Sequence, residues 1–268
     1  MTRSLLPALA LLVAASPTIA QTQPGEQAAI DTAMRRAHVM YWYDRAAWQG
    51  TDDMLAKSKE VAGKIGGWIV DGPAEEPLLI FYSKGTDPAP IYLARFRNGK
   101  LMEGRVARAE ERSLITPARK RLIDAVAVAR DALQQANVAR CSDKPFNSIV
   151  LPPEVEGGPV RVYFLTPQTA TDAIPFGGHY LIGVDAAGRT APIRKFTNSC
   201  ISAPTKKPDG SKSLGLVITH LLDPVPTEIH GFSAMAARTP VYVGTSDKRI
   251  WRVVPAATGP TVTLVQKP

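Results

Sequence analysis

Three of the four histidines, one of the two cysteines and a glutamate fall within residues 176–233 of this 268-residue chain. Imidazole nitrogens, thiolates and carboxylate oxygens are the groups that bind metal ions and transfer protons in proteins. A functional site is therefore first expected in this stretch. The side chains that could do such chemistry are His179, Cys200, His220, Glu228 and His230.

The segment 214–232 is predicted to form an antiparallel hairpin that brings two of these histidines together. Pro224 and Pro226 cannot donate hydrogen bonds to a ladder, so both are expected in the turn. If the turn has three residues, His220 lies directly opposite His230. If it is one residue longer, the register shifts and the two histidines lie on opposite faces. We expect the shorter turn because it removes both prolines from the ladder with the shortest loop.

In the shorter register, Glu228 lies on the same face as the two histidines, two residues from His230. With His179 as a third imidazole ligand, His220 and His230 could then hold zinc. No HExxH or H-x-H spacing accompanies these residues, and histidines hydrogen-bonded within a sheet are the simpler interpretation. We therefore expect no cofactor and keep a zinc site as the alternative.

The first 20 residues have the pattern of a secretory signal peptide. Arg3 precedes an apolar run at 5–15, and the small residues Thr18 and Ala20 stand where a signal peptidase reads the chain. The apolar run is too short to cross a bilayer, which takes ~20 apolar residues. We expect cleavage after Ala20, a mature chain beginning at Gln21, and a periplasmic or secreted protein that does not span the membrane.

The two cysteines are expected to form a disulfide, because an exported protein folds in an oxidising compartment. A bridge between Cys141 and Cys200 would stabilise the fold by about 4 kcal/mol in the chain-entropy model. The alternative is that Cys200 is a thiolate nucleophile paired with His179 or His220. A bridged sulfur cannot attack a substrate, so the two interpretations exclude each other.

The chain is mildly basic, with a formal net charge of +8 that falls to +7 when Arg3 is removed with the signal peptide. The basic residues are scattered and interleaved with acidic ones, and no basic stripe with stacking aromatic residues is present. This pattern does not fit a nucleic-acid-binding protein. It allows contact with an anionic envelope surface or a small ligand, although the partner itself stays unknown.

Hydrophobic periodicity divides the chain into helices and strands. Helices are expected at 26–48 and 117–136, with a short capped helix from 51 to about 62. An antiparallel meander is expected at 68–70, 78–83, 91–97 and 101–107, with Asn98-Gly99 as its clearest turn. Further strands are expected at 146–151, 160–166, 179–184, 190–197, 214–222, 227–232, 240–244, 249–254 and 262–265.

The fold class predicted from these elements is α+β, mainly antiparallel β-sheet in meander hairpins with two main helices packed on it. The mature chain divides into an N-terminal lobe at 21–137 and an antiparallel β lobe at 138–268, which could form one continuous domain. Because no catalytic constellation has a specific spacing, we expect a non-catalytic ligand- or partner-binding protein of the cell envelope. The alternative is a metal-dependent hydrolase built on the histidine and glutamate cluster.

Overall fold

The computed structural model describes residues 24–266, and its first element is the 34-residue helix α1 (Pro24–Lys57). The signal peptide expected at 1–20 lies outside the described residues. Helix α1 continues through Gly50 to Lys57, so the helix end predicted at 48 and the separate helix predicted from 51 were wrong. Gly50 is buried, and a Cβ atom at this position would overlap the side chain of Leu79. The glycine allows close packing of helix on sheet, and that packing outweighs its low helix propensity.

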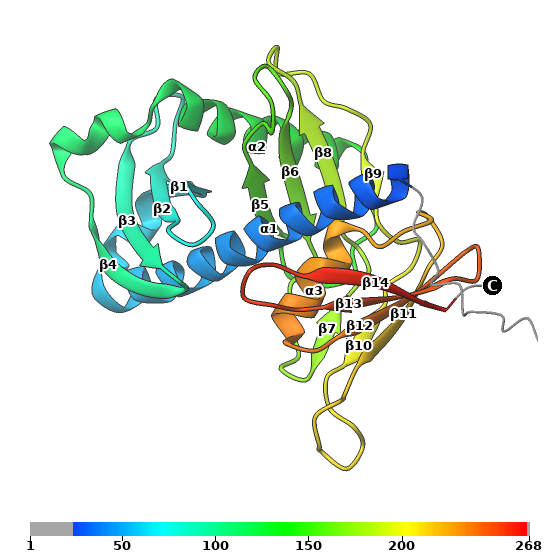
Figure 1. The fold of residues 1–268 in the computed structure, drawn as a ribbon. Helices are drawn as coiled ribbons and strands as arrows, with labels where there is room; N and C mark the ends of the chain where they lie inside the picture. Colours follow the sequence, from blue (N-terminus) through cyan, green and yellow to red (C-terminus); the bar gives the residue numbers. More distant parts are fainter. Residues whose placement is uncertain (1–23, 267–268) are drawn as a thin grey trace, which may run out of the picture.

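Two four-stranded antiparallel sheets lie side by side, and α1 runs along both of them (Figure 1). The first has the order β1-β2-β3-β4 and the second the order β5-β6-β8-β9. Their strands are β1 (Ile65–Asp71), β2 (Leu78–Ser83), β3 (Pro90–Arg97), β4 (Lys100–Val106), β5 (Asn147–Leu151), β6 (Val160–Leu165), β8 (Tyr180–Val184) and β9 (Arg194–Lys195). The first sheet confirms the predicted meander, and its Asn98-Gly99 turn has the positive φ angles of 48° and 74° that such a turn requires.

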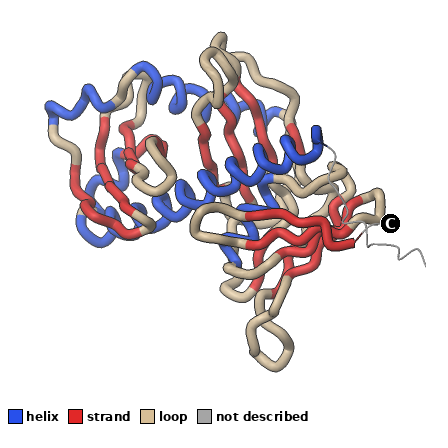
Figure 2. The backbone as a smooth tube through the Cα atoms, in the orientation of Figure 1, coloured by secondary structure: helices blue, strands red, loops and turns tan. Residues whose placement is uncertain are grey.

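Helices cover both faces of this pair of sheets (Figure 2). Helix α2 (Pro117–Gln135) begins as predicted, because the side chain of Thr116 accepts a hydrogen bond from the backbone N–H of Arg119 at 3.3 Å. Its apolar stripe packs against strands of both sheets on one side, while α1 packs against the other side. Two short 3-10 helices connect these elements: η1 (Lys59–Lys64) lies between α1 and β1, and η2 (Ala109–Leu114) lies between β4 and α2. The end of the helix expected at 51–62 is occupied by η1.

A third sheet packs against the N-terminal half of α1 through helix α3 (Glu228–Ala237). Its order is β11-β12-β13-β14, and a separate two-stranded ladder of β7 and β10 lies beside it. These strands are β7 (Ala173–Pro175), β10 (Ser202–Pro204), β11 (Leu216–His220), β12 (Val241–Thr245), β13 (Ile250–Val254) and β14 (Thr261–Gln266). The described chain is thus an α+β fold of mostly antiparallel sheets, as predicted.

The hairpin predicted at 214–232 does not form. Strand β11 is followed in the chain by α3 and then by β12, and β12 pairs with β11 in parallel. The alternation from Thr227 to Phe232 predicts a strand, but these residues begin a helix whose N-cap is Thr227. The two prolines do lie outside the ladder, in the loop between β11 and α3. The strand expected at 190–197 is also reduced, to β9 and one isolated bridge at Thr190.

Candidate functional site

His220 and His230 lie next to each other even though no hairpin joins them. The centroids of the two rings are 4.7 Å apart and their planes meet at 78°. His220 is the last residue of β11, and His230 lies in the first turn of α3. Their relative exposures are only 2 % and 3 %, so the pair is enclosed by protein rather than open to a ligand.

The ring of His230 caps helix α3. Its Nδ1 atom accepts a hydrogen bond from the backbone N–H of Thr227 at 2.9 Å. Thr227 is the N-cap and His230 the third residue of the helix, so the two residues form a capping box in which histidine takes the usual place of glutamate. Burial, followed by the nearby charge of His220, lowers the pKa of His230 to about 3. His230 is therefore a neutral structural residue.

His220 is held by a carboxylate that the sequence analysis did not select. Its Nε2 atom lies 2.9 Å from Oδ2 of Asp223, and the guanidinium of Arg194 donates to the other oxygen of Asp223 at 3.0 Å. The H-x-x-D spacing at 220–223 was the available signal for this pair. This chain of contacts ties β9 to the end of β11.

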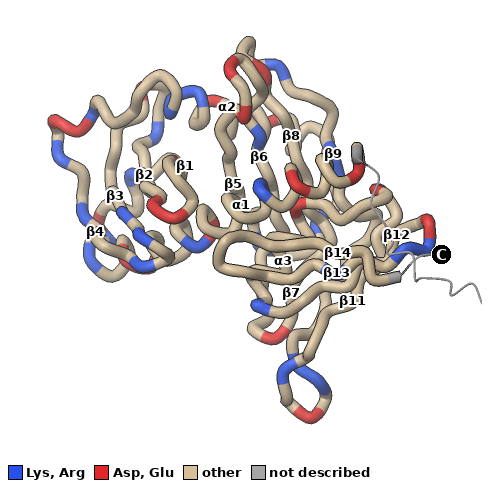
Figure 3. Tube along the Cα trace, in the orientation of Figure 1, with Lys and Arg blue, Asp and Glu red and all other residues tan. Residues whose placement is uncertain are grey.

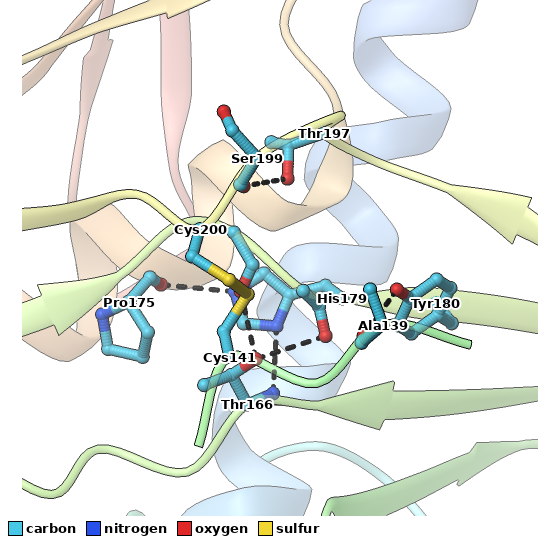
Figure 4. The surroundings of a disulfide bond; sticks show 11 residues. Ala139, Cys141, Thr166, Pro175, His179, Tyr180, Thr197, Ser199 and Cys200 are labelled. Atoms are coloured by element: carbon cyan, nitrogen blue, oxygen red, sulfur yellow. Dashed lines mark hydrogen bonds between the residues drawn. A yellow bond between two sulfur atoms is a disulfide. The ribbon is translucent and has the colours of Figure 1, made fainter. Parts of the chain in front are cut away.

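His179 also has protein partners on both ring nitrogens (Figure 4). Its Nδ1 accepts from the backbone N–H of Thr166 at 3.1 Å, and its Nε2 donates to the carbonyl oxygen of Pro175 at 3.0 Å. Burial lowers the pKa of His179 to about 4, partly opposed by the bond to Pro175. A metal could bind this ring only after one of the two contacts had been broken.

Glu228 has a different set of neighbours from the histidines. It is buried at the start of α3 and accepts a hydrogen bond from the hydroxyl of Tyr163 at 2.8 Å. A guanidinium nitrogen of Arg36 lies 4.0 Å away, and Arg36 is itself paired with Glu154. Glu228 therefore connects α3 to the central sheet and to α1. Between residues 24 and 266, no group of three or more histidine, cysteine, aspartate or glutamate side chains is placed to hold a metal ion.

The disulfide between Cys141 and Cys200 is confirmed, with their Cα atoms 5.3 Å apart. It joins the segment after α2 to the loop that precedes β10, and its sulfur atoms are not available as nucleophiles (Figure 4). Gly178 lies directly against it: a Cβ atom at Gly178 would come within 2.6 Å of the sulfur of Cys141. At Gly177 a Cβ atom would overlap backbone atoms of Ser199 and Cys200, so the glycine pair lies where another stretch of the chain approaches closely.

The sequence analysis missed a cleft of about 550 Å³ between the two central sheets. Strands β1 and β5 form facing edges there, and within the described chain no ladder hydrogen bonds join them. The cleft lies at the N-terminal ends of both strands, beside the C-terminal half of α2. Its lining residues are Gly66, Gly67, Trp68, Arg130, Leu133, Gln134, Asn137, Val138, Arg140, Pro145, Phe146, Ser148 and Phe164.

The cleft combines an apolar interior with a cationic rim. Leu133 and Phe164 are buried, and Trp68 and Phe146 are half-buried, so aromatic and aliphatic surface is available to a ligand. The exposed Arg130 and Arg140 are the charged residues among those lining it. A volume of this size lies within the range typical of small-molecule sites. Elsewhere lysine and arginine are spread along the chain with acidic residues between them (Figure 3).

Comparison with protein-family models, with curated proteins and with solved structures gives no match for this chain. None of the helices in the described part of the chain combines the length and apolar character needed to cross a membrane. Any function must therefore be argued from the site itself.

Proposed function

We propose that this protein is a non-catalytic binding protein of the cell envelope, and that the cleft between β1 and β5 holds its ligand. The observation that carries the proposal is the cleft itself, an apolar space of about 550 Å³ with polar and cationic groups at its rim. Concave, mainly apolar sites with a few polar groups are where proteins bind small molecules.

A second depression, of about 720 Å³, lies between α1 and the segment 258–262, which leads into β14. It contains Asp31 and Glu75 together with Arg35 and His38, and His38 is already paired with Glu75 at 3.0 Å. Its charges therefore largely compensate one another. The cleft between the sheets has more apolar surface and cations without acidic partners, so it is the better candidate for a ligand.

The alternative, a metal-dependent hydrolase, needs open ligand atoms and a place for substrate. The rings of His179 and His230 are buried, neutral and hydrogen-bonded, and the carboxylate of Glu228 accepts a hydrogen bond from the hydroxyl of Tyr163. A polar group buried in this way is costly to release from its partners. These contacts favour the binding function. Stoichiometric zinc in the purified protein would instead support the hydrolase.

Export is part of the proposal, and it rests on the signal-peptide pattern together with the disulfide. We expect the protein recovered from the periplasm or medium to begin at Gln21. Intact-mass measurement would check this, since cleavage removes residues 1–20 as one piece. The same measurement before and after reduction reports the disulfide separately. A recovered protein that retains Met1 would contradict export by this route.

Binding can be tested with N-phenylnaphthylamine, an uncharged apolar probe whose fluorescence rises when it leaves water. We expect saturable binding to the wild-type protein. Val138→Trp, which adds bulk inside the cleft, should weaken that binding by tenfold or more, equivalent to about 1.4 kcal/mol. The matched control is Val155→Trp, the same change at an exposed turn position outside the cleft. No saturable binding, or equal binding by both variants, would overturn the proposed site.

A further inference from the structure

The two arginines at the cleft differ from many others in the described chain, because neither makes an ion pair there. Most of the half-buried arginines in the described chain form an ion pair with a carboxylate. Examples are the pairs Arg36–Glu154, Arg105–Glu111, Arg119–Asp71 and Arg249–Glu26. Arg130 and Arg140 both line the cleft and have no such partner among residues 24–266. Their positive charge is therefore available to whatever occupies the cleft.

Arg140 is also held in place before any ligand arrives. Its Nη2 atom donates to the backbone carbonyl oxygens of Asp143, at 3.0 Å, and of Lys144. Its guanidinium carbon lies 5.9 Å from the ring centre of Phe146. Both hydrogen bonds use one nitrogen, so Nε and Nη1 keep their N–H groups for another acceptor. A side chain fixed in this way loses less conformational entropy when it binds an anion.

The position of α2 offers a competing explanation, in which basic residues merely complement the negative end of the helix. That effect contributes about 0.3–1 kcal/mol and acts within the last turn. The last turn of α2 contains no basic residue, and Arg130 lies five positions before its final residue, Gln135. Helix complementation therefore does not account for Arg130. A cationic ligand is disfavoured because it would meet two arginines and no lining carboxylate.

We infer that the ligand of the cleft is an amphipathic organic anion, whose apolar body lies on Trp68, Leu133 and Phe164 and whose anionic group lies between Arg130 and Arg140. This inference rests on the proposed binding function. Charge-assisted hydrogen bonds to a guanidinium are stronger than neutral ones, and they would orient the ligand in an otherwise apolar site. The charge selects the class of ligand, and the apolar interior supplies most of the contact.

The test compares two probes that share one aromatic skeleton, N-phenylnaphthylamine and its sulfonated counterpart anilinonaphthalene sulfonate. The wild-type protein should bind the sulfonate at least tenfold more tightly, and the difference should shrink as salt is added. In the double variant Arg130→Gln/Arg140→Gln, the sulfonate should bind no more tightly than the neutral probe, whose own affinity should stay within about twofold of wild type. Arg252→Gln, a single replacement of the same kind at an exposed position on β13, should keep the preference, and it is compared with each single cleft variant as well as with the double one.

The possible outcomes are distinguishable. If neither probe binds, the proposed function fails together with this inference. If both probes bind the wild-type protein equally, the cleft is a neutral apolar site and only the inference fails. A preference that survives in the double variant would place the anion elsewhere and also overturn it. Arg140→Lys should keep a reduced preference, because lysine supplies charge without the planar set of donors.

The nature of the anionic group can be resolved with natural head groups. A fatty carboxylate and an alkyl phosphate of equal chain length should each displace the sulfonated probe better than the corresponding alcohol does. The stronger competitor identifies the preferred head group. If the alcohol competes as well as either anion, the inferred role of the two arginines is wrong.

Discussion

Replacing Cys141 and Cys200 with serine is expected to lower the free energy of unfolding by about 4 kcal/mol, because the bridge closes a loop between residues 59 apart. A loss of this size is a large fraction of the stability of an ordinary domain. Urea unfolding of the double variant and the wild type, without reductant, measures it. Adding reductant should reproduce the loss in the wild type and leave the variant unchanged. Equal unfolding curves would show that the closed loop adds little.

The same double variant should also weaken binding in the cleft. Cys141 adjoins Arg140, so the bridge fixes the segment that carries one rim of the cleft. A second attachment remains in the variant, since the hydroxyl of Tyr180 donates to the carbonyl oxygen of Ala139 at 2.6 Å. We therefore expect a partial loss of probe affinity rather than its abolition. Unchanged affinity in a destabilised variant would separate the disulfide from the site.

The features that the sequence predicted well depend on local patterns. The meander from 78 to 106 follows from alternating apolar residues and from Asn98-Gly99, which needs no distant contact to turn the chain. Helix α2 follows from one apolar stripe, its Thr116 cap and Pro117. The disulfide followed from the number of cysteines and the expected compartment. In each case local preference and tertiary structure agree.

The errors occur where tertiary packing overrides a local signal. Gly50 has the form of a helix stop, but the sheet beneath α1 requires a residue without a Cβ atom. The residues from Thr227 to Phe232 alternate like a strand, yet the alanine-rich sequence after them and the Thr227 cap make them the start of α3. The closeness of His220 and His230 was therefore expected for the wrong reason. A strand and a helix bring them together.

The cleft could not be predicted from the sequence, because no single segment contains it. Its walls come from 66–68, from the second half of α2 and from 137–148. Their proximity depends on two sheet edges, β1 and β5, that face each other without pairing. Strand-pairing rules predict the register of strands that are hydrogen-bonded to each other. They do not predict which unpaired sheet edges will face each other. Nothing in the local sequence marks Arg140, beside Cys141, or Trp68, after two glycines, as part of a cleft.

Acidification is expected to destabilise the fold through its buried histidines. A histidine whose folded pKa is lowered binds a proton more readily when unfolded, so the unfolded state gains stability as the pH falls below about 6.5. Burial lowers the pKa of His230 to about 3 and that of His179 to about 4. Each therefore costs about 1.4 kcal/mol per pH unit between 6.5 and its folded value, or about 2 kcal/mol at pH 5. This cost is absent above pH 6.5, where both histidines are neutral in the folded and unfolded states, and it grows as the pH falls below 6.5.

Asp44 acts in the opposite direction over part of this range. Its pKa is raised to about 6, chiefly by burial, so the folded state takes up a proton there before the unfolded state does. The pH dependence of the wild-type protein alone is thus a sum of opposing effects. A comparison with a variant that differs only at His230 removes the contribution of Asp44, since it is common to both proteins.

His230→Gln is that variant, and it should be more stable than the wild type at pH 5 while nearly equal to it at pH 7.5. Glutamine at this position can accept the hydrogen bond from the N–H of Thr227, as in the common form of the capping box, and it does not titrate. Urea unfolding across pH 4.5–7.5 should give a difference in stability that grows by about 1.4 kcal/mol per pH unit below 6.5. His230→Ala also does not titrate but leaves that N–H without its partner, so it should be about 1–3 kcal/mol less stable than His230→Gln at every pH. Parallel pH profiles of the wild type and His230→Gln would show that His230 is not held neutral in the fold.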